Sequence, residues 1–339
     1  MLISRQNFIS QAIITATERC LNVIIPSLFA FIAISSILIN SNLIIYIAKP
    51  FNLISKTLFG FSGEIFIIMI ISNISGFPVG ANLLVKMIDN KQISKKTAEK
   101  LCCFCYGGGP AFFSGAIGLT VFHSSRAGMI IFLSCLISNM ILALIIGQIY
   151  KPTLTGNNNN ISINSECIIQ SVLSAGKALF TICVTIIFFA AMIAVIETTG
   201  FFDIFSQDIG VYIKGVAEIS NLSEITAKST KIIPIVTSIC SFGGICVLMQ
   251  IKAIVKDKIS LKFFIAARIC AMAIAYGISD IAVKIFLPKE IYAAAVHTRP
   301  VINSDNIIPS ICLICMIFII FSGNKRGKKE EVKSQGKIC

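Results

Sequence analysis

The amino-acid sequence predicts an all-α integral membrane protein with about eight transmembrane helices, arranged as two parallel-topology repeats with glycine/proline-broken helices. Three observations lead to this prediction. Hydrophobic residues make up 55% of the 339 residues and charged residues only 13%, whereas soluble proteins carry about 25% charged residues. Apolar runs of about 20 residues, the length that crosses a bilayer, recur along the chain. Similar interruptions by glycine or proline appear in both halves.

Eight segments are long and apolar enough to be predicted as membrane spans. They cover residues 20–39, 64–85, 103–122, 127–149, 175–197, 232–251, 263–287 and 307–322. The further apolar segment 42–61 contains Pro50 and scattered lysines, which favour a helix lying in the membrane interface over a full crossing.

The basic residues predict the orientation of these spans. The net charge of +13 is concentrated in short segments between the apolar runs, as in the cytoplasmic loops of membrane proteins. We therefore expect both termini in the cytoplasm of a cell-membrane protein, a lipid bilayer as partner, and no nucleic acid. The predicted regions are a first repeat of four spans at 1–150, a polar linker at 151–166, a second repeat of four spans at 167–322 and a basic cytoplasmic tail at 323–339.

The two repeats are suggested by a gap-free alignment of residues 74–94 with residues 240–260. It pairs Ser75 with Ser241 and Lys86 with Lys252. Each segment has a small-residue break around an aromatic residue, then a lysine-rich hairpin, then another apolar span. Interrupted helices at corresponding positions of two halves are typical of transporter binding sites.

The breaks themselves are the first candidate functional residues. Gly76 and Pro78, Gly107 to Gly109 before Pro110, and Gly243 with Gly244 free backbone groups that lipid cannot satisfy, so this backbone must be buried in protein or line a cavity. A helix restarting after Gly109 would direct its positive end at an anion. The alternative is that these small residues only allow helices to pack closely.

Polar side chains near the breaks complete the candidate site. Arg268 is either an anion ligand or a side chain that extends to the membrane surface. Asp280 either carries a coupling ion or pairs with Lys284 one turn away. The predicted substrate-binding set is Asn73, Ser75, Gly76, Asn82, Gly107, Gly108, Gly109, Ser114, Ser241, Gly243, Gly244, Gln250 and Arg268.

No motif supports enzymatic chemistry, a cofactor or a resident metal. The two histidines, His123 and His297, form no HExxH or triad-like pattern. Cys312 and Cys315 form a CxxC inside an apolar run without a second pair, which indicates packing rather than zinc. Cys102, Cys103 and Cys105 are the one cysteine cluster that keeps a metal role open.

The motifs "SGFPVGA" (75–81), "CYGGGPAFFSGAIG" (105–118) and "SFGGICVLMQ" (241–250), followed by Arg268, resemble the nucleoside-recognition gate domain family. The nearest type is the sporulation integral membrane protein YlbJ family of spore-forming Firmicutes, over residues 20–287. The resemblance implies a distant relation to concentrative nucleoside transporters. It also implies a location in the mother-cell or outer forespore membrane, and movement of dipicolinate toward the forespore.

Three functions are therefore in view. The first is a transporter of a small anionic or heterocyclic solute, such as dipicolinate. The second is a non-transporting scaffold for assembly of the spore envelope or cortex. The third is a nucleoside or ferrous-iron permease, because gate-type domains also occur in iron carriers and Cys102, Cys103 and Cys105 are available. Under any of these functions, a second copy of the chain or other sporulation membrane proteins are expected as possible partners.

Overall fold

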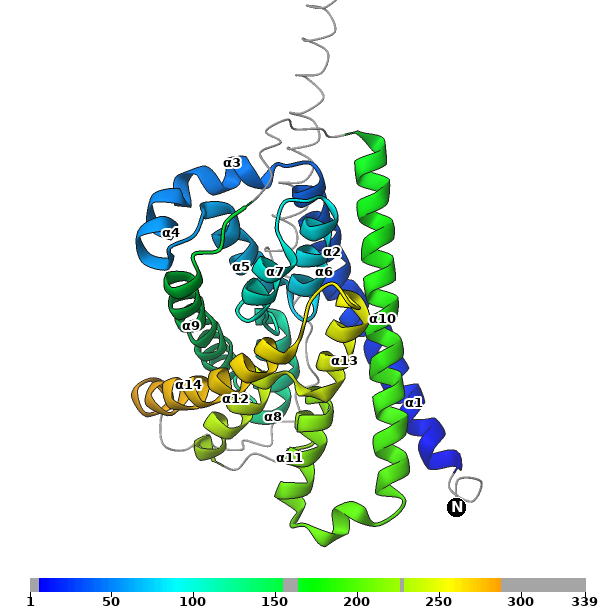
Figure 1. The fold of residues 1–339 in the computed structure, drawn as a ribbon. Helices are drawn as coiled ribbons and strands as arrows, with labels where there is room; N and C mark the ends of the chain where they lie inside the picture. Colours follow the sequence, from blue (N-terminus) through cyan, green and yellow to red (C-terminus); the bar gives the residue numbers. More distant parts are fainter. Residues whose placement is uncertain (1–5, 155–163, 226–228, 288–339) are drawn as a thin grey trace, which may run out of the picture. The chain divides into compact units, whose positions relative to one another are not determined.

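A computed structural model describes residues 6–154, 164–225 and 229–287, which fold into helices joined by short turns, with no strand in these ranges (Figure 1). Apart from Asn164 and Ser165, these residues belong to one unit by their contacts. The predicted span 307–322 and the predicted tail lie outside the described residues, as do His297, Cys312 and Cys315.

Four helical segments are long and apolar enough to cross a membrane. They are α9 (Ser125–Tyr150), the 33-residue α10 (Ser165–Glu197), the segment Thr230–Val255, and α14 (Lys262–Phe286). A fifth candidate is the pair Leu28–Asn40 and Ile44–Phe59, which is bent by 93°. Four or five candidates within the described residues support a membrane protein, while the total of about eight spans stays a prediction.

A turn in the N-terminal region produces the bend between Leu28–Asn40 and Ile44–Phe59. Helix α1 (Gln6–Arg19) continues through the π-helical η2 (Cys20–Ile24) into α2 (Ile25–Asn40). A turn then leads into α3 (Ile44–Ala48), η3 (Lys49–Phe51) and α4 (Asn52–Phe59). Leu53 and Leu58 of α4 are 78% and 52% exposed, which fits a helix whose outer face contacts lipid.

The predicted span 64–85 consists of two helices separated by the predicted break. Helix α5 (Gly63–Ser75) ends at Gly76, whose φ of 88° favours glycine. Helix α6 (Val79–Asp89) begins directly after Pro78. The Ser94 hydroxyl then accepts a hydrogen bond from the Thr97 backbone N–H and caps α7 (Lys95–Cys102).

The predicted span 103–122 is interrupted at its predicted glycine break, and the non-helical part also includes the residues just before the three glycines. Residues 103–109 are not helical, and Gly109 has a φ of 72°, which a helix does not allow. We call residues 103–109 the glycine loop. Helix resumes at Pro110, as predicted, and continues through the π-helical η4 (Phe112–Leu119) and α8 (Thr120–Phe122).

The second half contains the other predicted break. After α10 come η5 (Phe201–Ile204), α11 (Gln207–Ala217), η6 (Ile219–Glu224) and η7 (Thr230–Ile232). Helix α12 (Ile233–Phe242) then stops at Gly243, which has a φ of 88°, and α13 (Gly244–Val255) follows.

Both halves thus contain the order helix, glycine break, short helix, lysine with positive φ, and helix. The two lysines are Lys91 and Lys256, with φ of 57° and 49°. Helices α6 and α13 pack against each other, and α14 packs against α9 and α12. The local order agrees with the alignment, whereas the repeat of whole four-span halves stays a prediction.

Candidate functional site

The glycine loop lies against the first break and against α5. Asn73 is 2% exposed, and its Nδ2 donates to the carbonyls of Met69 at 2.8 Å and Phe104 at 3.0 Å. A Cβ on Gly107 would lie 2.9 Å from Asn73 Oδ1. The predicted residues Asn73, Gly76 and the three loop glycines therefore come together, and the glycines are needed for this close approach.

Tyr106 connects this region to the second break. Its hydroxyl donates to the carbonyl of Phe242 at 2.7 Å, and its ring centroid lies 4.5 Å from that of Phe77. A Cβ on Gly243 would lie only 1.7 Å from Tyr106 Oη. The two interrupted helices thus meet at one tyrosine, which comes from the glycine loop.

Arg268 of α14 is fully buried, with 0% of its surface exposed. Its Nη1 donates to Asn139 Oδ1 at 2.9 Å, its Nη2 donates to the Cys103 carbonyl, and its guanidinium carbon lies 4.8 Å from the centroid of the Tyr106 ring. Nε has no partner. Arg268 therefore does not extend to the membrane surface, and that alternative is wrong.

The charge of Arg268 is not balanced by an acidic side chain within residues 6–154, 164–225 and 229–287, where no carboxylate forms an ion pair with it. An isolated buried charge costs several kcal/mol, even after the protein relaxes around it. Two hydrogen bonds and an aromatic face offset part of this cost, and an anion would offset more.

Asn139 of α9 belongs to the site although the sequence reasoning did not include it. Its Nδ2 donates to Asn73 Oδ1 at 2.7 Å and to the Tyr106 carbonyl, while its Oδ1 accepts from Arg268. It links α5, α9, α14 and the glycine loop through one amide. A polar residue within an apolar span was the available signal.

A recess lies beside this network. It is lined by residues 76–81, 102, 105–107 and 251. The recess has no room for a water molecule, whereas usual ligand pockets hold roughly 300–1,000 Å³. The recess is therefore not an open ligand pocket in this structure.

The other predicted residues surround the centre without entering it. Ser241 is 4% exposed and its Oγ has no partner, whereas Ser114 Oγ donates to the Pro110 carbonyl of its own helix at 2.7 Å. Gln250 donates to Cys246 Sγ at 3.4 Å. Within the described part of the chain, the remaining members, Ser75, Asn82 and Gly244, form no hydrogen bond with Arg268 or Tyr106.

Asp280 lies in an ion pair, as one of its two predicted alternatives expects. Its carboxylate is 2.6 Å from Lys284 Nζ, and the two side chains are 39% and 71% exposed. Cys102, Cys103 and Cys105 are buried, and within the described ranges no three His, Cys, Asp or Glu side chains gather as a metal site.

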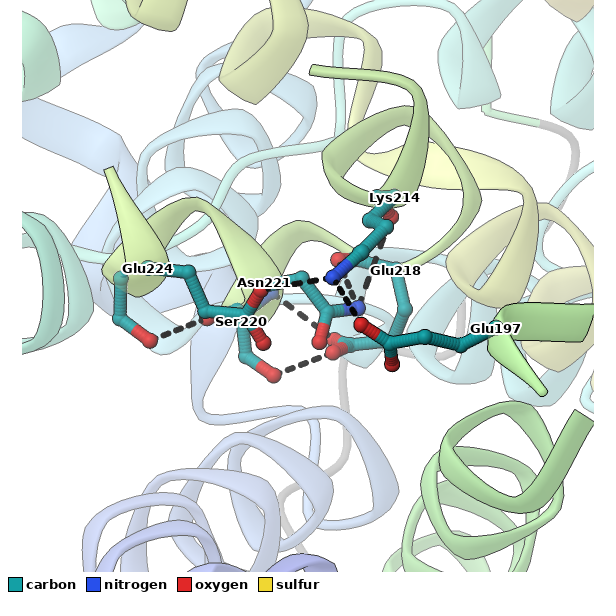
Figure 2. A network of polar contacts seen from close by, with 7 residues as sticks. Glu197, Lys214, Glu218, Ser220, Asn221 and Glu224 are labelled. Carbon is teal, nitrogen blue, oxygen red and sulfur yellow. Dashed lines mark hydrogen bonds and ion pairs between the residues drawn. The ribbon is translucent and has the colours of Figure 1, made fainter. Parts of the chain in front are cut away.

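A second polar network, not predicted from the sequence, lies at α11 and η6 (Figure 2). Lys214 forms ion pairs with Glu197 at 2.8 Å and Glu224 at 3.1 Å. Glu218 is 7% exposed and accepts from both the backbone N–H and the hydroxyl of Ser220. Burial raises the pKa of the Glu218 carboxyl, and the Ser220 hydrogen bonds and the nearby Arg19 oppose this shift.

Comparison with known proteins gives one partial match among curated sequences. Over 122 residues, which are 36% of this chain and 30% of the relative, the chain is 25% identical to "Sporulation integral membrane protein YlbJ" of Bacillus subtilis (strain 168). No family model and no solved structure matches. The apolar helices support an integral membrane protein, and the chain is similar to about a third of a sporulation integral membrane protein.

Proposed function

We propose that this chain is a multi-pass membrane permease for a small anionic or heterocyclic solute such as dipicolinate, which it moves toward the forespore. The observation that carries this proposal is the buried Arg268, which has no carboxylate partner among the described residues and contacts the glycine loop at Cys103 and Tyr106. The name of the relative supports a setting in sporulation, although the match covers only 30% of that protein. We place the chain in the mother-cell or outer forespore membrane for the same reason.

In this mechanism Tyr106 lies between Phe77, which lines the recess, and the guanidinium of Arg268. A carboxylate entering at the recess would displace the Tyr106 ring and bind Nε of Arg268, which has no hydrogen-bond partner among the described residues. The positive-φ glycines at both breaks supply the backbone freedom for this opening.

A membrane scaffold for assembly of the spore envelope is the second candidate. The observation that favours it is that the recess at the candidate site has no room for a water molecule. A nucleoside permease has less support, because a neutral solute would leave the Arg268 charge unbalanced. A ferrous-iron permease lacks a trio of side-chain ligands within the described ranges.

Uptake into liposomes that contain the purified chain separates these functions. We expect labelled dipicolinate to enter, while labelled nucleosides and Fe²⁺ stay outside. Arg268→Gln should abolish uptake, whereas Arg126→Gln, at an exposed arginine of α9, should leave it unchanged. Absence of uptake of all three solutes by folded wild-type protein would support the scaffold and refute the permease.

A further inference from the structure

Helix α6 presents two buried nitrogen donors that have no acceptor among the described residues. Asn82 Nδ2 and Lys86 Nζ are both inaccessible to solvent, and neither forms a hydrogen bond within residues 6–154, 164–225 and 229–287. They are four residues apart, so they lie one turn from each other on the same face of the helix. Two donors on one helix face suit the oxygens of a single anionic group.

Among the described residues, no carboxylate forms an ion pair with Lys86. On α10, Cys167 is the group whose charge would act on Lys86, and its carbonyl accepts from Ser171 Oγ at 2.7 Å. Ser171 Oγ in turn accepts from Asn40 of α2 at 2.9 Å. The carboxylate of α6 itself, Asp89, is paired with Lys258.

The lysine at the corresponding position of the second half, Lys252, is exposed to solvent and has acceptors. Lys252 of α13 aligns with Lys86 and lies in the last turn of its helix. Its side chain is 62% exposed, and its Nζ lies 3.1 Å from the Lys256 carbonyl and 3.8 Å from Asp257 Oδ1. Lys86 lies in the last turn of α6 but has neither solvent around its Nζ nor an acceptor.

The unpaired donors are energetically unfavourable as they stand. A buried amide N–H without a partner costs about 1–3 kcal/mol, and a buried ammonium costs more. A carboxylate or phosphate oxygen would satisfy both donors at once, with one charge-assisted bond from Lys86. Because the rest of the Lys86 side chain is partly exposed, its ammonium can move to admit such a group.

We propose that Asn82 and Lys86 bind one oxyanion group, a carboxylate or a phosphate, on the face of α6 next to Cys167. This site is distinct from the Arg268 network and does not depend on transport by the chain. Two sources share this chemistry, namely a soluble anion and the phosphate of an anionic lipid headgroup.

The test uses the purified full chain in nanodiscs of phosphatidylcholine. Inorganic phosphate and dipicolinate are titrated in one arm, and phosphatidylglycerol is added to the bilayer in the other. Binding is measured by the unfolding temperature, since a ligand of the native state raises it. A soluble source gives a shift in the first arm, and a lipid source gives a shift only in the second.

Lys86→Met and Asn82→Leu should each weaken binding of the anion that raised the unfolding temperature, and Lys86→Met should lower the affinity at least tenfold. Lys252→Met is the matched control and should change nothing. Equal losses for Lys86→Met and Lys252→Met would mean nonspecific charge attraction and would overturn the site. So would unchanged affinity in Lys86→Met.

A measurement on the wild type guards against variants that do not fold. The Lys86 amine is acetylated with and without each anion, and the modified peptide is quantified by mass spectrometry. Binding should slow acetylation of Lys86 and leave that of Lys252 unchanged. Equal acetylation of Lys86 under all conditions would refute the proposal.

Discussion

Replacing Gly243 by alanine should destabilise the contact between the two breaks. Gly243 has a φ of 88°, and a Cβ there would lie 1.7 Å from Tyr106 Oη. The left-handed backbone costs a non-glycine residue about 1–2 kcal/mol. Moving Tyr106 aside also removes its hydrogen bond to the Phe242 carbonyl, worth about 1 kcal/mol. The total loss of stability is then roughly 2–3 kcal/mol.

A double-mutant cycle tests whether the tyrosine causes this loss. Tyr106→Phe removes Oη, after which the atom nearest to the new Cβ is Cζ at 2.8 Å. The loss in Gly243→Ala, Tyr106→Phe should therefore be smaller than the sum of the two single losses, by about 1 kcal/mol. Denaturant or thermal unfolding in detergent measures all four proteins.

The control is Gly277→Ala in α14, where a Cβ would meet no atom within 4 Å. Alanine has the higher helix propensity, so this variant should be neutral or more stable by up to about 1 kcal/mol. Additive losses in the cycle, or a Gly243→Ala protein as stable as the Gly277→Ala protein, would refute the packing of Tyr106 against the second break.

Three further predictions concern polar residues. Asn139→Leu should lower the free energy of unfolding by about 3–5 kcal/mol, because it leaves the buried Arg268 with one acceptor. A loss of about 0.5 kcal/mol or less, as for a surface substitution, would contradict this role. In Glu218→Gln, stability relative to wild type should rise with pH above 4.5, because a raised carboxyl pKa contributes stability that is lost as pH rises through it; thermal unfolding at several pH values checks the sign. Asp280→Asn breaks only an exposed pair with Lys284 and should change stability by about 0.5 kcal/mol or less with uptake retained; lost uptake would instead favour a coupling role.

The sequence was informative wherever one residue type dictates the backbone. Gly76 and Gly243 adopt positive φ and end their helices, and Pro110 starts the helix after the glycine loop, as predicted. The non-helical stretch before Pro110 begins at residue 103, four residues before the predicted break at Gly107. Apolarity measures partition into lipid and not helicity, so the sequence did not show that residues 103–106 also leave the helix.

The partners in the site could not be predicted, because they are set by tertiary packing. Arg268 binds Asn139, which is 129 positions away, and Arg19 of α1 reaches Ser220, which is 201 positions away. Neither pair forms a local motif. The sequence indicated that Arg268 was important but could not decide between the membrane surface and the interior, because that depends on which helices surround α14.

The length of α10 has a consequence for the membrane boundary. Its 33 residues extend about 50 Å at 1.5 Å per residue, whereas the hydrocarbon layer is about 30 Å thick. Even at a tilt of about 40°, the upper end of the usual range, roughly 26 residues suffice to cross it. At least one or two turns of α10 must therefore stand in the headgroup layer or in water, and its polar first turn, with Ser165 and Glu166, is the end suited to do so.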